Sequence, residues 1–164
     1  MQSISEQLDS RMLREAFGAF PTGVVAVAAQ IGERLVGLAA SSFTSVSLDP
    51  PLVSFSVSKG SSTWPELRRA AHLGLSVLAE DHGALCRQLA GPAQERFTGV
   101  AFEITDGGAV MLAEAIAQYD CTVRAEFEAG DHVIVLLQLH DVVIRSRGQP
   151  LIFHRSGFRR LAPA

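Results

Sequence analysis

The sequence predicts a mainly β fold with peripheral helices, in which antiparallel strands form a closed or nearly closed barrel. Short runs rich in β-branched residues, separated by turn-forming residues, fill most of the chain after Val24. Helical periodicity is confined to three short stretches. Closing the sheet removes exposed strand edges, and 164 residues suffice for one domain, 1–164, with a sizeable core.

The first helical stretch, Ser3–Phe20, predicts an N-terminal helix within residues 1–20, because its apolar side chains recur at spacings of three and four. Pro21 and Gly23 end this helix. The barrel is then expected over residues 23–160. Its run "VIVLLQLHDVVI" is apolar on both faces, so part of the barrel surface needs a cover. The amphipathic first helix and a second subunit are the candidates, and the latter predicts a homodimer.

Six strand runs follow in order, over residues 24–30, 34–41, 50–58, 72–80, 118–128 and 131–146. Two shorter helices are expected between them. "STWPELRRAA" has Thr63 three residues before Glu66, a capping-box pattern, and "DHGALCRQLA" begins with Asp81. The segment 91–111 carries three closely placed glycines and is expected to be a long loop.

Composition excludes several classes of function. A net charge of −3 gives no basic field for nucleic acid. No run of about 18 apolar residues suggests a membrane span, and the N-terminus lacks the apolar core of a secretory signal, so a cytoplasmic location is expected. Cys86 and Cys121 lie far apart with no histidine at a zinc-binding interval, so no metal site is expected.

The stretch "GLAASSFTSVSLDPP", residues 37–51, is unusually rich in hydroxyl groups and small side chains. Small residues let a ligand approach the backbone, and free N–H and hydroxyl groups donate to carbonyl or phosphate oxygens. The stretch is also consistent with a connection whose hydroxyls cap their own backbone. Composition alone favours this second interpretation.

A second hydroxyl cluster, "SVSKGSSTW", places Ser58–Thr63 directly before a predicted helix. Helix N–H groups, a lysine and several hydroxyls suit a phosphate, but the same residues make an ordinary helix cap. Farther along, Gly130 and Asp131 suit a hairpin turn, whereas the imidazole of His132 can hydrogen-bond an amide or balance a phosphate. The final "FHR", 153–155, suits either a clamp for a flat anionic ligand or an edge strand.

Taken in order, these segments resemble the flavin reductase family with the FMN-binding split-barrel fold, the reductase components of two-component flavin monooxygenases. The resemblance rests on "AFGAFPTGVVAV", "GLAASSFTSVSLDPPLVSFSV", "SSTW", "LGLSVLAEDHGALCRQLA", "ERF", "GDH" and "PLIFHRSGF", which cover nearly the whole chain. It implies a Greek-key antiparallel split barrel. It also implies an NAD(P)H-dependent flavin reductase (EC 1.5.1 type) that reduces FMN or FAD and supplies diffusing reduced flavin to a partner monooxygenase.

The resemblance implies a role for particular residues. The flavin would contact Thr22, Ala40, Ser41, Ser42, Phe43, Thr44 and Ser47. Its phosphate would contact Ser58, Lys59, Ser61, Ser62 and Thr63, with Arg96 as a nearby cation. The pyridine nucleotide, NADH or NADPH, would contact His132, Phe153, His154 and Arg155, while Asp131 serves the turn. No catalytic side chain is implied, because hydride passes between stacked rings.

Two features depart from the family pattern. Phe153 stands where relatives often have a tyrosine, and the segment after the barrel is very short. Other interpretations stay open: a flavin- or haem-binding split barrel without turnover, which does not need His132, a lipocalin-like carrier, or a reductase of another acceptor such as ferric iron or chromate. The sequence does not choose between FMN and FAD, or between NADH and NADPH, and does not identify the monooxygenase.

Overall fold

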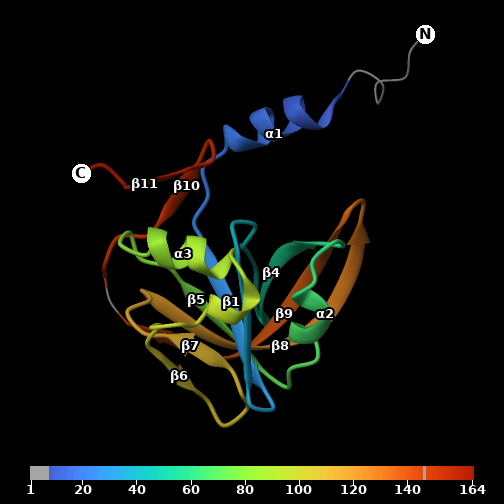
Figure 1. Ribbon diagram of the computed structural model, residues 1–164, viewed down its shortest axis with the longest axis vertical. Helices are drawn as coiled ribbons and strands as arrows, with labels where there is room; N and C mark the ends of the chain where they lie inside the picture. Colours follow the sequence, from blue (N-terminus) through green and yellow to red (C-terminus); the bar gives the residue numbers. More distant parts are fainter. Residues whose placement is uncertain (1–7, 146) are drawn as a thin grey trace.

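The computed structural model describes residues 8–145 and 147–164, and its centre is a seven-stranded antiparallel sheet (Figure 1). The strands are β1 (Val25–Ile31), β2 (Arg34–Ala40), β3 (Thr44–Leu48), β4 (Pro51–Ser58), β5 (Leu73–Val77), β8 (Ala117–Ala129) and β9 (His132–Ile144). Their order in the sheet is β2-β1-β5-β8-β9-β4-β3. Because residues of β1 and β4 share one core cluster, the sheet curls into a barrel.

The mainly β, split-barrel prediction is confirmed, but β3 was not among the six expected strand runs, and a second segment was interpreted wrongly. Residues 91–111 are not a long loop: they hold a 3-10 turn, Ala93–Glu95, and β6 (Phe102–Ile104), which pairs with β7 (Val110–Leu112). Of the three glycines that suggested a loop, Gly107 and Gly108 lie in the turn between these two short strands, and Gly99 precedes β6. A last hairpin, β10 (Ile152–His154) and β11 (Gly157–Arg159), follows the main sheet.

The barrel is split between the end of β2 and β4, and one side chain bridges the two. Just beyond β2, the Ser42 hydroxyl accepts a hydrogen bond from the N–H of Ser56 at 2.8 Å and donates to the Ser56 carbonyl oxygen at 3.0 Å. These contacts replace a strand ladder at this place, since β2 and β3 are the two edges of the sheet. The gap beside this bridge is where the hydroxyl-rich segments meet.

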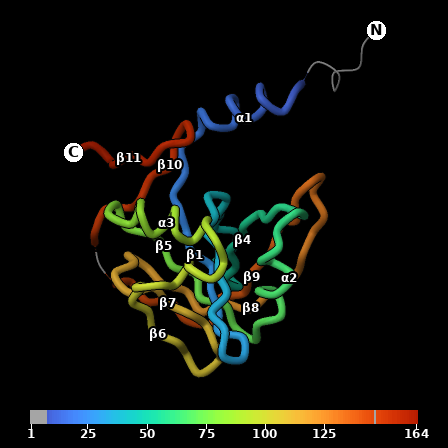
Figure 2. Tube along the Cα trace, viewed as in Figure 1, coloured from blue at the N-terminus to red at the C-terminus, as the bar shows by residue number. Residues whose placement is uncertain are grey.

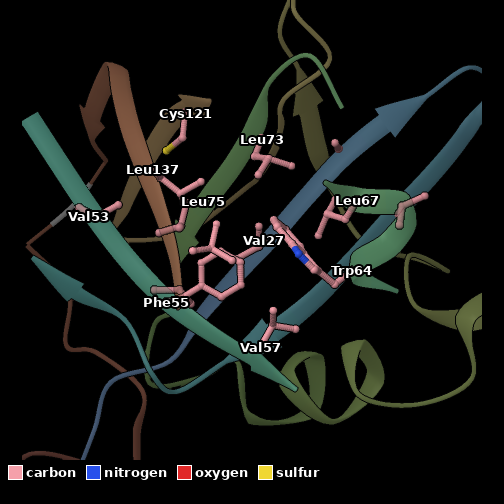
Figure 3. Packing of buried hydrophobic residues seen from close by; sticks show 14 residues of the cluster. Val27, Val53, Phe55, Val57, Trp64, Leu67, Leu73, Leu75, Cys121 and Leu137 are labelled. Atoms are coloured by element: carbon pink, nitrogen blue, oxygen red, sulfur yellow. The ribbon is translucent and has the colours of Figure 1, made fainter. Parts of the chain in front are cut away.

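The barrel interior is filled by alternating side chains of the sheet and by α2 (Trp64–Leu67). Figure 3 shows Phe55, Val27 and Trp64 meeting in the centre of this core. The rings of Phe55 and Trp64 pack edge to face with centroids 5.5 Å apart. Cys121 is also buried here, and burial raises the pKa of its thiol to about 12, so it stays protonated and behaves as an apolar residue.

The N-terminal helix α1 (Ser10–Gly18) begins at Asp9, whose carboxylate accepts a hydrogen bond from the N–H of Met12 at 2.8 Å. The predicted start at Ser3 lies outside the described residues. Figures 1 and 2 show α1 projecting away from the barrel, and none of its residues is buried. The expectation that it covers the barrel of its own chain is therefore wrong. No helix in the described ranges is long and apolar enough to cross a membrane.

The helix α2 is shorter than predicted and is capped differently. Thr63 and Glu66 do not form the predicted capping box. Instead the Ser61 hydroxyl accepts hydrogen bonds from the N–H groups of Thr63 and Trp64, both at 3.2 Å. The third helix, α3 (Gly83–Leu89), starts after His82 rather than at Asp81. Because the Thr63 hydroxyl does not cap α2, it is available to accept a hydrogen bond from Arg96.

Candidate functional site

A cavity of about 990 Å³ opens beside the split in the barrel, and we call it the central pocket. Its walls come from the end of β2, from β4, from the connection between β4 and α2, from the tip of the β8–β9 hairpin, and from α1. Of the predicted site residues, it brings together Ala40, Ser41, Ser42, Ser58, Ser61, Thr63, Arg96 and His132. A volume of this size accommodates a large ligand.

The first hydroxyl segment contributes backbone donors, and one of its hydroxyls is already occupied. The Ser42 hydroxyl is occupied by its two hydrogen bonds to Ser56. The N–H groups of Ser41, Ser42 and Phe43 follow the end of β2, outside the strand ladders, and none has an acceptor among the described residues. Unpaired N–H groups next to a pocket are donors for a ligand carbonyl oxygen.

Other members of the predicted flavin set do not line the central pocket. Phe43 packs against the barrel core and stacks on Tyr119 with ring centroids 6.1 Å apart. Thr44 and Ser47 belong to β3. Thr22 pairs with β10 through its backbone, and its Oγ1 is buried without a hydrogen-bond partner in the described part of the chain.

The second hydroxyl cluster is divided among three cavities. Ser58, Ser61 and Thr63 face the central pocket. Lys59 lines a smaller pocket beside α2, where its Nζ lies 3.8 Å from a carboxylate oxygen of Glu128. Ser62 lines a different cavity on the far side of Thr63. Lys59 and Ser62 therefore line cavities that adjoin the central pocket and share Ser58, Ser61 and Thr63 with it.

Arg96 is held at the wall of the central pocket by neutral acceptors. Its Nη1 donates to the carbonyl oxygen of Gly37 and to Oγ1 of Thr63, both at 2.8 Å, and its Nε donates to the carbonyl oxygen of Gly91 at 2.9 Å. In the described ranges no carboxylate lies within ion-pair distance of it. A fixed, half-buried guanidinium without a counter-charge is suited to an anionic ligand.

His132 lies at the tip of the β8–β9 hairpin, beyond a two-residue turn of Gly130 and Asp131. Gly130 has φ +66°, which glycine adopts without strain. The imidazole Nδ1 lies 2.8 Å from a carboxylate oxygen of Asp131, and this hydrogen bond lowers the pKa of Asp131. Asp131 also lines the pocket, so it contacts the imidazole in addition to serving the turn.

The remaining pyridine-nucleotide candidates lie elsewhere in this chain. Phe153 packs against Phe158, and its backbone pairs with Thr22. His154 Nε2 lies 3.1 Å from the carbonyl oxygen of Ala19, and the N–H of Arg155 donates to the carbonyl oxygen of Gly18 at 3.0 Å. These contacts tie the β10–β11 hairpin to the end of α1. They do not bring the hairpin to His132.

Several pocket residues were not identified from the sequence. The helix α1 contributes Ser10, Leu13, Arg14 and Phe17 to the wall, and α3 contributes Leu89, with Ala90 after it. The spacing of three and four along α1 was visible as one helical face, but nothing in that pattern shows that the face borders a pocket. Within the described residues no group of three metal-binding side chains occurs.

The geometry thus defines a class of protein: a split barrel with one large pocket, which is bordered by backbone donors that have no acceptor among the described residues and by a fixed cation with three hydroxyls. The donors suit carbonyl oxygens and the cation suits a phosphate, and a flavin nucleotide carries both groups. The residues present therefore fit this ligand.

The chain belongs to the flavin reductase family, because a family model described as "Flavin reductase like domain" matches residues 17–162. It is 36% identical over 154 residues to an FMN reductase (NADH) of Agrobacterium fabrum, covering 94% of this chain and 87% of that protein. It is 36% identical over 148 residues to the reductase component of 4-hydroxyphenylacetate 3-monooxygenase from Thermus thermophilus, covering 90% and 94%. The solved NADH:FAD oxidoreductase of Streptomyces globisporus superposes with a TM-score of 0.90 at 32% identity, covering 100% of this chain and 99% of that one.

These comparisons confirm the predicted family and the predicted function of a flavin reductase. They also confirm that its cofactors are a flavin and a pyridine nucleotide. The roles of individual residues, the homodimer and the cytoplasmic location stay predictions.

Proposed function

We propose that this protein is an NAD(P)H:flavin oxidoreductase of the EC 1.5.1 type that reduces FMN or FAD in the central pocket and supplies reduced flavin to a separate monooxygenase. The observation that carries the proposal is the central pocket itself. It combines N–H groups without an acceptor among the described residues, hydroxyls, a guanidinium without a carboxylate partner among them, and an imidazole in one cavity of about 990 Å³. Such a site binds two ring systems and needs no nucleophile.

The bound flavin supplies the hydride-accepting ring, and the protein binds and orients it. The N–H groups of Ser41–Phe43 are positioned to donate to the ring carbonyl oxygens, where negative charge increases on reduction. Ser58, Ser61, Thr63 and Arg96 form the phosphate end. Apolar side chains of α1, such as Leu13 and Phe17, border the opening and limit the access of water.

His132 is proposed as the contact for the pyridine nucleotide. It lies at the rim of the pocket, and its ring is half-exposed and steadied by Asp131. With Nδ1 facing Asp131, Nε2 is left for a second substrate that enters from solvent. Phe153, His154 and Arg155 are not part of this rim within one chain, so their predicted nucleotide contact requires either movement of the hairpin or a second subunit.

The product is proposed to leave the pocket for a monooxygenase. Reductase components of monooxygenases are among the relatives of this chain, including the one from Thermus thermophilus. The proposed phosphate end holds Arg96 and neutral hydroxyls, Arg14 of α1 is a second cation in the pocket wall, and the pocket is open to solvent beside α1. The single cation at the phosphate end and the open pocket favour exchange of the flavin rather than permanent binding.

We further propose a homodimer. Phe17 on α1 and Phe20 just after it are 71% and 75% exposed, and Ile144 at the end of β9 is 78% exposed. Large apolar side chains that are this exposed are unfavourable in water and are typical of an interface. Light scattering at micromolar concentration is expected to give twice the chain mass of 17.5 kDa. A monomer alone would contradict the dimer.

An anaerobic titration tests the activity. Purified protein with FMN or FAD is mixed with NADH or NADPH, and the loss of flavin absorbance is followed. We expect stoichiometric flavin reduction and steady NAD(P)H consumption once oxygen is admitted. A split barrel that only stores flavin or haem would bind the ligand but would not speed this reaction above free flavin, and that result would overturn the proposal.

A further inference from the structure

The helix α1 presents one continuous stripe of side chains to the central pocket. The stripe consists of Ser10, Leu13, Arg14 and Phe17, whose spacings of three and four place them on one face of the helix. None of these residues is buried, and Figure 1 shows α1 projecting from the barrel. The helix therefore forms an outer wall of the pocket, and the position of α1 decides where the stripe lies.

Arg14 is the cation of this stripe. The residue is exposed, and its guanidinium has no hydrogen-bond or ion-pair partner among the described residues. The other arginine in the pocket wall, Arg96, belongs to the proposed flavin phosphate end. A pyridine nucleotide that stacks on the flavin brings two further phosphates to the solvent side of the pocket, beside α1. Arg14 is the cation available to them there.

The C-terminal end of α1 is held by the β10–β11 hairpin. The carbonyl oxygen of Gly18 accepts a hydrogen bond from the N–H of Arg155 at 3.0 Å, and that of Ala19 accepts one from Nε2 of His154 at 3.1 Å. Carbonyl groups at the end of a helix lack partners within the helix, and donors there also suit the negative end of the helix dipole. Two residues of the "FHR" segment thus cap α1.

The turn of this hairpin is arranged to present the cap. Arg155 and Ser156 form its two-residue loop with φ +50° and +61°, a left-handed conformation that costs energy in residues other than glycine. The base of the hairpin is fixed to α3, where the guanidinium carbon of Arg87 lies 4.9 Å from the centroid of the Phe158 ring. A hairpin anchored at its base and bonded to α1 at its tip is suited to hold the helix in one position.

We propose that Arg14 binds the pyrophosphate of the pyridine nucleotide, and that His154 and the backbone of Arg155 act on the reaction by positioning α1. Arg14 is then a binding residue for the second substrate, and His154 is a positioning residue that does not touch it. The inference rests on the proposed function, because it requires a pyridine nucleotide in the central pocket. It gives the hairpin a role within one chain, without the movement or the second subunit that direct contact would need.

Steady-state kinetics with saturating FMN tests the role of Arg14. Arg14→Gln should raise the KM for NADH about threefold to tenfold with little change in kcat, the effect of one exposed charge-assisted hydrogen bond. Arg11→Gln removes an exposed cation of the same helix that does not line the pocket, and it should leave the KM unchanged. Because α1 has no buried residue, neither substitution should unfold the barrel. An unchanged KM in Arg14→Gln, or equal rises in both variants, would overturn the inference.

A double variant separates positioning from direct contact. His154→Ala should raise the KM for NADH by no more than Arg14→Gln does, and the double variant should be no worse than Arg14→Gln alone, since His154 acts through α1. His154→Gln keeps an N–H donor for the Ala19 carbonyl oxygen and should restore most of the wild-type KM. Effects that multiply in the double variant would show that His154 contacts the nucleotide itself, against the inference.

Hydrogen exchange of the backbone amides of residues 10–19 checks the cap without any turnover. With flavin bound and NADH absent, His154→Ala should speed this exchange, whereas Arg14→Gln should not. Equal exchange in His154→Ala and the wild type would show that the hairpin does not hold the helix, and would overturn the positioning role. Failure of the wild-type protein to reduce flavin with NADH is a different result, which would overturn the proposed function and the inference with it.

Discussion

Ser42 and Ser56 are joined by two hydrogen bonds across the split in the barrel, with Ser42 Oγ accepting from the Ser56 N–H at 2.8 Å and donating to the Ser56 carbonyl oxygen at 3.0 Å. The Ser42 side chain thus satisfies the backbone N–H and carbonyl groups of Ser56, as a neighbouring strand does elsewhere in the sheet. The bridge also fixes the backbone from Ser41 to Phe43, whose N–H groups face no protein acceptor in the described ranges. The Ser42–Ser56 bridge is therefore expected to affect both the stability of the fold and the binding of a ligand by these N–H groups.

Ser42→Ala should reduce both properties. The substitution leaves the N–H and carbonyl groups of Ser56 without their partner in a half-buried place, which costs roughly 1–3 kcal/mol of unfolding free energy. Urea denaturation measures this cost, and flavin affinity should fall in the same variant. Ser45→Ala, at an exposed position of β3, is the control and should change stability by less than about 0.5 kcal/mol. Similar effects of the two substitutions would show that the bridge is unimportant.

Arg96→Gln should separate binding of the phosphate from binding of the flavin ring. Loss of a charge-assisted hydrogen bond costs about 1.5–3 kcal/mol, so FMN affinity should fall about tenfold or more. Riboflavin lacks the phosphate and should lose much less. Lys59→Gln is the matched cation control, because Lys59 faces Glu128 in another pocket. If riboflavin binding falls as much as FMN binding, Arg96 acts by holding the loop that contains Gly91.

His132→Ala should raise the KM for NADH and leave flavin affinity nearly unchanged, because its partner is the second substrate. One lost hydrogen bond predicts a fall in kcat/KM of roughly 3- to 150-fold, depending on whether the partner is charged. Asp131→Asn keeps the turn and an oxygen acceptor for Nδ1, so its effect should stay within about threefold. Loss of flavin in His132→Ala would instead place His132 at the flavin.

The carboxylate of Glu126 should make the protein sensitive to acid. It accepts hydrogen bonds from Arg68 and from Trp64 Nε1, and the bond from Arg68 holds its pKa below the ordinary 4.5. A lowered folded-state pKa stabilises the protein above pH 4.5, and this contribution is lost as the pH falls through the folded value. Glu126→Gln should therefore lower Tm at pH 7, and the difference from wild type should shrink at pH values below about 4.

Glu128→Gln is the control for this pH profile. Glu128 lies on the same strand, and its side chain is 87% exposed and only 3.8 Å from Lys59. The Tm of the Glu128→Gln protein should follow that of the wild type at every pH. Parallel pH profiles for Glu126→Gln and the wild type would show that Glu126 contributes no pH-dependent stability.

Local patterns explain what was predictable from the sequence. Alternating β-branched runs and turn residues placed six of the seven strands of the main sheet, all except β3, and Gly130 with Asp131 placed the hairpin tip that presents His132. Strand formation and tight turns depend on neighbouring residues, so a linear pattern is informative about them. The short strands β6 and β7 were missed because glycines and polar residues between them resemble a loop, and only pairing across the turn makes them strands.

Tertiary structure decided which residues of the site line which cavity. Ser61 and Thr63 line the central pocket and also an adjoining cavity each, whereas Lys59 and Ser62, in the same short cluster, line an adjoining cavity alone. Arg96 reaches Thr63 from 33 positions away. Such contacts depend on how the sheet curls and on which edge each connection crosses, and both are set by long-range strand pairing that no local spacing encodes. The sequence therefore determined which chemical groups this flavin reductase has available, and the curl of the barrel decided which of them meet in one pocket.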